Sequence, residues 1–198
     1  YNGVDIKKFD DGKVIYYLIP GAPALKYNSN LEKYWKIVNE EFKPDLVHIH
    51  GTEFAHGLAF INACTNVKTV TSIQGLVSMY EKVYLGDIPE NTVRKNVTFR
   101  DFIKMDNLLQ QKKQFAKRGK LETELIKRSD AIIGRTDWDY ANTKAINPEE
   151  SYFVGNETLR TGFYGKEWNL ENIERHSIFT SQASYPIKGL HFLLQAIY

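Results

Sequence analysis

The sequence predicts an α/β fold in which a parallel, Rossmann-like sheet is covered by helices on both faces. Short apolar runs alternate along the chain with amphipathic runs of ten or more residues, which is typical of βαβ units. The β-branched run KTVTSI over 68–73 is typical of a strand buried on both sides. Of the 198 residues, 42% are hydrophobic and 25% charged, so the chain can bury a core and is not collagen-like, mucin-like or disordered.

The elements of the first half follow one another in βα order. A strand over 13–19 ends at the turn Pro-Gly-Ala-Pro. The amphipathic run over 30–42 begins at Asn30, which can cap a helix, and its apolar side chains form one stripe. Two further strands, over 45–50 and 68–73, flank an expected helix over 53–65.

The second half begins with a stretch over 74–98 that has no clear period. Residues 99–128 then predict one long basic helix, and Gly119 is its expected breaking point. The remaining expected elements are a strand over 130–136, a helix over 137–146, a short strand over 152–154, a strand that begins over 176–182, and a final helix over 189–198.

The ends of the chain and its single cysteine indicate a piece of a larger cytoplasmic protein. The chain starts at Tyr1 without a methionine or a signal peptide, and it stops inside an expected helix that has no cap. Cys64 is the only cysteine, which excludes an intrachain disulfide and points to a reducing compartment. No apolar run approaches the roughly 18 to 20 residues that span a bilayer.

Charge is unevenly distributed along the chain. Residues 92–129 contain eleven basic and four acidic side chains, a net charge of +7, which leaves −5 for the rest of a chain whose total is +2. Such asymmetry favours an anionic partner, either a phospholipid headgroup or a phosphorylated substrate. The alternative is a solvated helix face without a partner.

Candidate site residues come from the ends of the expected strands. In open parallel sheets, ligands bind at the carboxyl ends of the strands, so the polar residues that follow each strand are the first candidates. They are His50, Gly51, Thr52 and Glu53 after the second strand, Gln74 and Gly75 after the third, Arg135, Thr136 and Asp137 after the fourth, Asn156 and Glu157 after the fifth, and Ser181 and Gln182 after the last.

Three of these stretches have specific chemical alternatives. His48 and His50 share one face of a strand and could ligate a metal, as in metal-dependent hydrolases, but no further ligand stands at a plausible spacing. Gln74 can donate and accept hydrogen bonds but cannot act as a general base. Lys188 and Gly189 precede the final helix, where a lysine and a helix N-terminus could together bind a diphosphate.

Several stretches, in their order, resemble glycosyltransferase family 4, a group of retaining enzymes with the GT-B fold. KPDLVHIHG over 43–51 is similar to the family's strand that ends in PD-x-x-H-x-H. SDAIIGRT over 129–136 and VGNETLR over 154–160 are similar to two later family motifs. IFTSQASYPIKGLHFLLQA over 178–196 resembles the opening of the family's second domain.

This resemblance implies the first half of a GT-B fold, truncated at both ends. Residues 1–174 would be most of the N-terminal, acceptor-binding domain, and residues 175–198 the first strand and helix of the domain that binds a nucleotide-diphosphate sugar. Lys188, Gly189, Ser181, Gln182, Asn156 and Glu157 would face the donor, Gln74 would stand at the catalytic position, and the remaining candidates would face the acceptor cleft. The family generally needs no metal or other cofactor, and the fragment alone is expected to be inactive.

The expected function is sugar transfer to a glycan or lipid-linked acceptor in bacterial-type polysaccharide synthesis. Family members usually have a histidine where this chain has Gln74 and an arginine near Ser181, and both differences keep a non-catalytic carbohydrate- or nucleotide-binding module as the alternative. A nucleotide-sugar epimerase with the same fold is a further alternative; it would need a complete second domain and acid-base carboxylates at the cleft. No nucleic-acid partner is expected.

The resemblance also implies where the basic segment would act. Many similar enzymes work at the cytoplasmic face of the inner membrane, so we expect weak peripheral contact through 99–128. The lysines expected to make it are Lys112, Lys113, Lys117 and Lys120. The apolar side chains of the same segment are expected to be mostly buried against the sheet.

Overall fold

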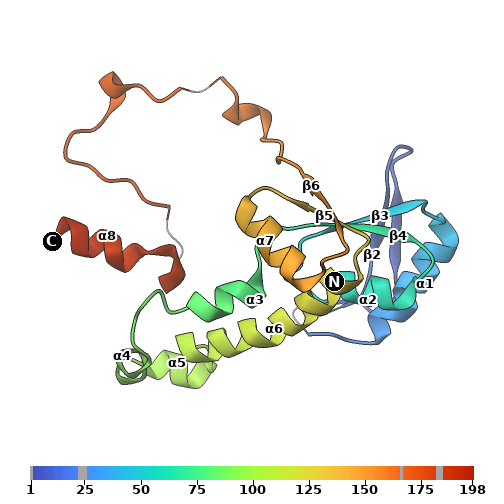
Figure 1. Cartoon of the computed structure of the whole chain (residues 1–198), viewed down its shortest axis with the longest axis horizontal. Helices are drawn as coiled ribbons and strands as arrows, with labels where there is room; N and C mark the ends of the chain where they lie inside the picture. The colour runs from blue at the N-terminus through green and yellow to red at the C-terminus, as the bar shows by residue number, and fades with distance from the viewer. Residues whose placement is uncertain (1, 22–25, 166, 182–184) are drawn as a thin grey trace.

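The computed structural model confirms the α/β prediction (Figure 1). It describes residues 2–21, 26–165, 167–181 and 185–198. Four parallel strands form one sheet in the order β3-β4-β5-β6. They are β3 (Leu46–His50), β4 (Lys68–Ser72), β5 (Ala131–Gly134) and β6 (Ser151–Val154). The helices that pack against the sheet or extend from it are α1 (Asn30–Phe42), α2 (His56–Ala63), α3 (Val77–Tyr80), α4 (Glu90–Lys95), α5 (Phe99–Lys104), α6 (Leu108–Arg128) and α7 (Asp137–Ile146).

The first expected strand lies outside this sheet. Residues 15–18 form β2 (Ile15–Leu18), which pairs antiparallel with β1 (Lys7–Asp10), a strand that the sequence did not predict. The Asp11 carboxylate accepts hydrogen bonds from the N–H groups of Lys13 and Val14, and Gly12 adopts a positive φ of 82°. A local turn of this kind joins two short strands, and an ion pair between Lys8 of β1 and Glu41 of α1 links the hairpin to the rest of the fold.

The helices cover one face of the described sheet, where the sequence predicted cover on both. Sequential strands lie side by side in one direction, and because parallel crossovers are right-handed, every crossover places its helix on the same face. Helices on both faces require the strand order to reverse, and the described strands contain no reversal. Leu46 and Phe153 on the opposite face are accordingly 59% and 56% exposed.

The hydrophobic core lies between the covered face and the helices. Ile49 of β3 packs with Leu58 and Phe60 of α2 and with Leu125 of α6. A second cluster joins Ile132 of β5 to Ile126 of α6 and to Ile73 and Leu76 beyond β4. The long helix α6 therefore contacts both clusters and is the central support of the sheet (Figure 1).

The expected single helix over 99–128 is two helices, and the break is not at Gly119. Met105 ends α5 with a left-handed φ of 53°, and Asn107 caps α6 by accepting hydrogen bonds from the N–H groups of Leu109 and Gln110. Gly119 lies within α6, where it allows close contact with Ser78 of α3. The stretch over 74–98 contains α3, a 3₁₀ turn (Glu81–Val83) and α4 rather than irregular chain alone.

Burial in this segment also differs from the expectation. Leu125 and Ile126 are buried, as expected of residues that face the sheet. In contrast, Phe99, Phe102 and Met105 are more than two-thirds exposed, because α5 turns away from the body of the protein. The apolar side chains of α5 therefore do not belong to the core.

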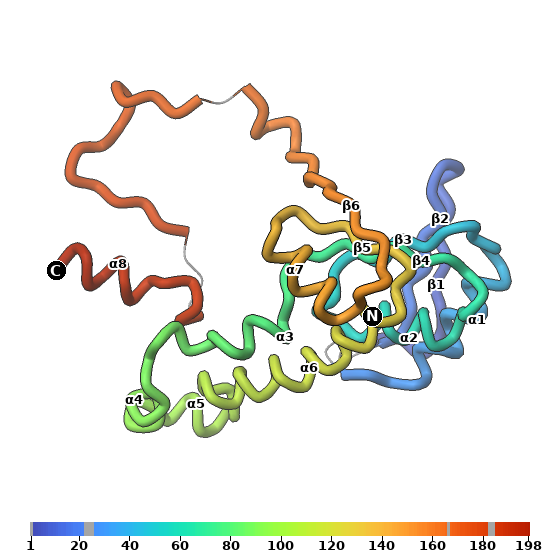
Figure 2. The backbone as a smooth tube through the Cα atoms, in the orientation of Figure 1, coloured from blue at the N-terminus to red at the C-terminus, as the bar shows by residue number. Residues whose placement is uncertain are grey.

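The chain after β6 makes a long excursion that returns at α8 (Leu190–Ile197), as Figure 2 shows. The expected strand over 176–182 is not formed by residues 176–181, and Gln182 lies outside the described residues. A strand needs a neighbour to pair with its backbone, and 176–181 has no strand beside it. Near α8, the His191 ring nitrogen Nε2 lies 2.7 Å from the carbonyl oxygen of Gly86.

No helix within the described ranges has the length and apolar character required to cross a lipid bilayer.

The contact at Gly119 gives a test of how closely α3 packs on α6. A methyl group added there would lie 2.7 Å from Ser78 Cα, so the α3 backbone would have to move. We expect Gly119→Ala to lower the free energy of unfolding by about 1 to 2 kcal/mol, because overpacking outweighs the gain in helix propensity. Urea unfolding measures the effect. Gly162→Ala, at a glycine with open space around it, should change stability little, and an equal loss in both variants would contradict the close contact.

Candidate functional site

A pocket of about 470 Å³ lies at the carboxyl ends of the four parallel strands. Each strand supplies residues to it from its last position or from the loop that follows. The lining residues are His48, His50, Ser72, Ile73, Gln74, Ile133, Arg135, Gly155, Asn156, Glu157 and Thr158. Parallel strands bring their carboxyl ends to one edge of a sheet, and this is why residues far apart in the sequence meet here.

Two histidines and a serine form the β3–β4 side of the pocket. The ring centroids of His48 and His50 are 3.9 Å apart, and His48 Nε2 lies 2.5 Å from Ser72 Oγ. Desolvation, together with the neighbouring His50, lowers the pKa of His48 below its ordinary value of 6.5. A neutral His48 near pH 7 can donate a hydrogen bond to Ser72 or accept one from it.

Arg135 connects three of the four strand ends. It follows β5, donates a hydrogen bond of 3.2 Å to the Gln74 carbonyl after β4, and forms an ion pair of 3.0 Å with Glu157 after β6. Its own N–H donates to Asp139 of α7 at 3.0 Å. The guanidinium is therefore held at the pocket, where it can contact an anionic or carbonyl-rich ligand.

The Gln74 side chain is an available polar group of the pocket. It is exposed, and its amide has no partner among the residues that the structure describes. The backbone around it is fixed, because its carbonyl accepts from Arg135 and the next residue, Gly75, is buried against the Tyr80 ring. A fixed backbone with a free amide is suited to hydrogen bonding with a ligand.

Glu122 of α6 supports the two loops that carry His50 and Gln74. Its carboxylate is fully buried and accepts from Thr52 Oγ1 at 2.5 Å, from the Val77 N–H at 3.1 Å and from the Ser78 N–H at 2.8 Å. Burial raises the pKa of this carboxyl group, whereas the three donors favour its ionised form. Glu122 thus ties α6 to the loop after β3 and to the start of α3.

The remaining predicted cleft residues shape the loops rather than line the pocket. Gly51 has a positive φ of 79° and donates its N–H to the Ser72 carbonyl at 3.0 Å, which closes the end of β3 onto β4. Thr136 caps α7 by accepting from the Asp139 N–H at 3.1 Å. Glu53 and Asp137 lie next to these turns and are not among the lining residues.

The structure brings together part of the predicted donor side and part of the predicted acceptor side. Asn156 and Glu157 line the same pocket as His50, Gln74 and Arg135. Ser181, Lys188 and Gly189 do not line it; they lie in the returning part of the chain before α8, and Gln182 is outside the described residues. The predicted donor residues are therefore divided between two places.

Sequence reasoning missed Ser72 and Glu122. Ser72 occupies the last position of β4, and the β-branched character of that strand drew attention to its burial rather than to its polar end. The signal for Glu122 was present: it falls on the same helical face as Gly119, Leu125 and Ile126, which are all buried. A carboxylate on a buried stripe predicts a specific partner inside the protein.

Among the described residues, the structure adds no third candidate metal ligand to His48 and His50. Within the described ranges, no group of three or more histidine, cysteine, aspartate or glutamate side chains gathers around one point. His56, the third histidine of the sequence cluster, begins α2 and does not line the pocket. His48 and His50 are therefore interpreted as hydrogen-bonding groups of the pocket.

Comparison of the chain with protein-family models gives no match, and a search of curated proteins gives none either. The functional interpretation therefore depends on the residues of the pocket, their geometry and the sequence motifs that precede them.

The Glu122 network predicts an effect that distinguishes it from a solvated acid. Glu122→Gln would replace one carboxylate oxygen by an NH₂ group and set it against an N–H or hydroxyl donor. We expect it to lower the free energy of unfolding by about 2 to 4 kcal/mol, because buried donors lose their acceptor. Glu124→Gln on the exposed face of α6 is the matched control and should cost less than about 0.5 kcal/mol. Equal stability of the two variants in urea unfolding would remove Glu122 from its supporting role.

The histidines predict a pH dependence of stability. Desolvation lowers the pKa of His56 below 6.5, and it lowers that of His48 in the same direction. The unfolded chain then binds protons more readily than the folded one, so the free energy of unfolding should fall as pH drops below 6.5. Urea unfolding at about pH 7.5 and 5.5 brackets the ordinary histidine pKa. The His56→Gln variant should have a smaller decrease than the unchanged protein, and an identical decrease would contradict the assignment.

Proposed function

We propose that this chain is the acceptor-side part of a retaining glycosyltransferase that resembles family 4. The observation that carries the proposal is the convergence of His50, Gln74, Arg135, Asn156 and Glu157 on one pocket at the carboxyl edge of the sheet. His50, Arg135, Asn156 and Glu157 fall within the sequence stretches that resemble the family, and Gln74 occupies the position where the family usually has a histidine. In this proposal, the complete protein transfers a sugar from a nucleotide-diphosphate donor to a glycan or lipid-linked acceptor in polysaccharide synthesis on the cytoplasmic side.

The composition of the pocket supports a sugar as its ligand. Imidazole, amide, guanidinium and hydroxyl groups stand around Ile133, whose side chain is half-buried on the open face of the sheet, whereas Ile73 belongs to the core. Sugar rings present hydroxyl groups around their edges and C–H groups on their faces, so they need both kinds of contact. A purely ionic ligand would not use the Ile133 side chain.

Several polar residues have a proposed role. Gln74 hydrogen-bonds the reacting sugar or the acceptor hydroxyl, and Arg135 binds an anionic group while Glu157 holds its orientation. Lys188 and Gly189 bind the donor diphosphate once the second domain is complete, and Ser181 lies in the same part of the chain. No resident metal or cofactor is required in this proposal.

A non-catalytic binding module is the second candidate, and one observation favours it. Among the described lining residues, Glu157 is the only carboxylate, and it is engaged with Arg135. The pocket thus offers the imidazoles of His48 and His50 but, among its described lining residues, no free carboxylate. Release of the nucleotide from a nucleotide sugar in the presence of acceptor separates the candidates, because a module would bind sugar without any turnover.

Gln74 provides the sharpest test on the complete protein. If its free amide contacts the substrate, Gln74→Ala should lower kcat/KM at least about tenfold, equivalent to one lost hydrogen bond in the transition state. Gln114→Ala, which removes an exposed amide from α6, should stay within about twofold because it touches no ligand. Steady-state transfer rates with UDP-glucose and GDP-mannose as donors provide the measurement. Unchanged kcat/KM in the Gln74 variant, with transfer intact, would exclude Gln74 from the site.

A further inference from the structure

Four large apolar side chains are exposed together at the end of the molecule away from the sheet. Phe99 is 79% exposed, Phe102 75%, Ile103 62% and Met105 71%. Phe99, Phe102 and Ile103 are spaced three and four residues apart, so they form one stripe along α5. Single exposed apolar residues are ordinary, but a contiguous group of this size marks an interaction surface.

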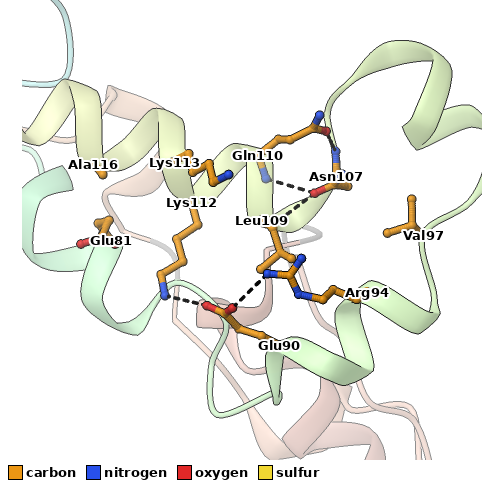
Figure 3. Close-up of a pocket in the computed structure, with 10 residues that line it drawn as sticks. All are labelled: Glu81, Glu90, Arg94, Val97, Asn107, Leu109, Gln110, Lys112, Lys113 and Ala116. Carbon is orange, nitrogen blue, oxygen red and sulfur yellow. Dashed lines mark hydrogen bonds and ion pairs between the residues drawn. The ribbon is translucent and has the colours of Figure 1, made fainter.

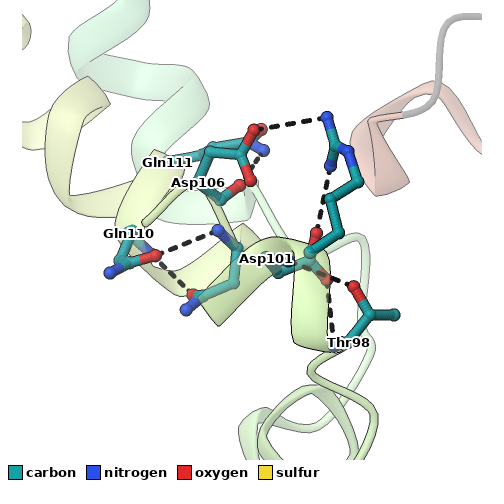
Figure 4. A network of polar contacts seen from close by, with 7 residues as sticks. Thr98, Asp101, Asp106, Gln110 and Gln111 are labelled. Atoms are coloured by element: carbon teal, nitrogen blue, oxygen red, sulfur yellow. Dashed lines mark hydrogen bonds and ion pairs between the residues drawn. The ribbon is translucent and has the colours of Figure 1, made fainter. Parts of the chain in front are cut away.

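The direction of this stripe is fixed by a polar network on the other side of α5 (Figure 4). Thr98 and Asp101 cap α5 reciprocally, with hydrogen bonds of 3.1 and 3.2 Å. The Asp106 carboxylate accepts a hydrogen bond of 3.5 Å from the Arg100 guanidinium. The Asp106 backbone carbonyl accepts one of 2.5 Å from the Gln111 side-chain amide. We call residues 97–107, which turn between α4 and α6, the α5 elbow.

The network engages polar side chains of the α5 elbow and leaves its large apolar side chains exposed. Its polar side chains are engaged with one another, so rotation of α5 to bury the phenylalanines would break the cap and the contacts to Asp106. The apolar stripe is therefore held outward before any partner arrives. A surface that is already oriented loses less conformational freedom on binding than a flexible one.

The charge around the stripe is positive. Lys95 and Lys104 flank it, are exposed, and have no partner among the described residues. Next to the elbow, a pocket of about 540 Å³ between α4 and α6 has Val97, Arg94, Lys112 and Lys113 in its lining (Figure 3). Glu90 pairs with both Arg94 and Lys112 there, whereas Lys113 has no ion-pair partner in the part of the chain that the structure describes.

We propose that the α5 elbow docks on an anionic lipid bilayer. Phe99, Phe102, Ile103 and Met105 enter the interface between headgroups and acyl chains, and Lys95, Lys104 and Lys113 contact lipid phosphates. Apolar side chains on one helix face with lysines beside them are the pattern of an interfacial helix. A protein partner would need an acidic rim around an apolar site to match the same surface. An anionic bilayer has both features, because its headgroups carry negative charge and its acyl chains are apolar.

This proposal changes the residues expected to touch the membrane. The sequence assigned the contact to four lysines of α6, but Lys112 is paired with Glu90 and only 28% exposed. Lys117 and Lys120 lie farther along α6, away from the elbow, and are not part of the proposed contact. The α5 stripe adds an apolar component, which salt does not screen. The proposal does not depend on glycosyl transfer.

Flotation of the chain with vesicles tests it. Vesicles of phosphatidylglycerol mixed with phosphatidylcholine should bind the protein, and phosphatidylcholine alone should bind it much less. The variant Phe99→Ser/Phe102→Ser/Ile103→Ser should bind anionic vesicles at least about tenfold more weakly, because membrane affinity scales with buried apolar area. The matched control Phe163→Ser/Leu170→Ser/Phe179→Ser removes equally exposed apolar side chains from the excursion and should stay within about twofold.

A charge variant separates the electrostatic contribution to vesicle binding from the apolar contribution. Lys95→Gln/Lys104→Gln should weaken binding and flatten its dependence on salt between about 0.1 and 0.5 M, because fewer charges are screened. Failure of the unchanged protein to bind anionic vesicles would overturn the proposal, and so would equal losses in the apolar variant and its control. A dimer in light scattering without lipid that dissociates in the apolar variant would assign the stripe to a second copy instead. Circular dichroism confirms that each variant retains its helices.

Discussion

The buried carboxylate of Glu122 is the interaction on which the arrangement of the pocket depends. Taking a carboxylate out of water costs several kcal/mol unless donors replace the lost hydration. Here the donors come from the loop after β3 and from the start of α3, so the cost is offset only when both segments are in place. Formation of this network therefore selects one position for the loops that carry His50 and Gln74.

The sequential strand order β3-β4-β5-β6 also affects the site. All described crossovers place their helices on one face, so the pocket at the carboxyl edge is continuous with an uncovered face on which His48, His50 and Ile133 stand. A closed cavity would need cover on that side. The described pocket is therefore open enough for a large ligand such as a glycan chain, which fits the proposed acceptor better than a small metabolite.

Individual residues explain which features were predictable from the sequence. Gln74, Arg135 and Asn156 could be assigned to one edge because the carboxyl ends of parallel strands meet whatever the order of the strands. The open face could not be predicted, since strand order is set by tertiary packing and not by local pattern. The end of α5 was hidden for another reason: Met105 adopts a left-handed conformation that favours glycine, so no glycine or proline marked the break.

The helix α6 joins the two surfaces for which we propose functions. The α5 elbow precedes its first turn, and Glu122 lies fourteen residues after Leu108, which corresponds to about 21 Å along the helix axis. Because α6 is one continuous helix, the elbow and the pocket keep a constant separation. A bilayer bound at the elbow would therefore fix the distance and direction of the pocket from the lipid surface. Membrane contact would then act by placement, bringing a lipid-linked acceptor within reach of Gln74. No conformational change between the two surfaces is needed for that effect.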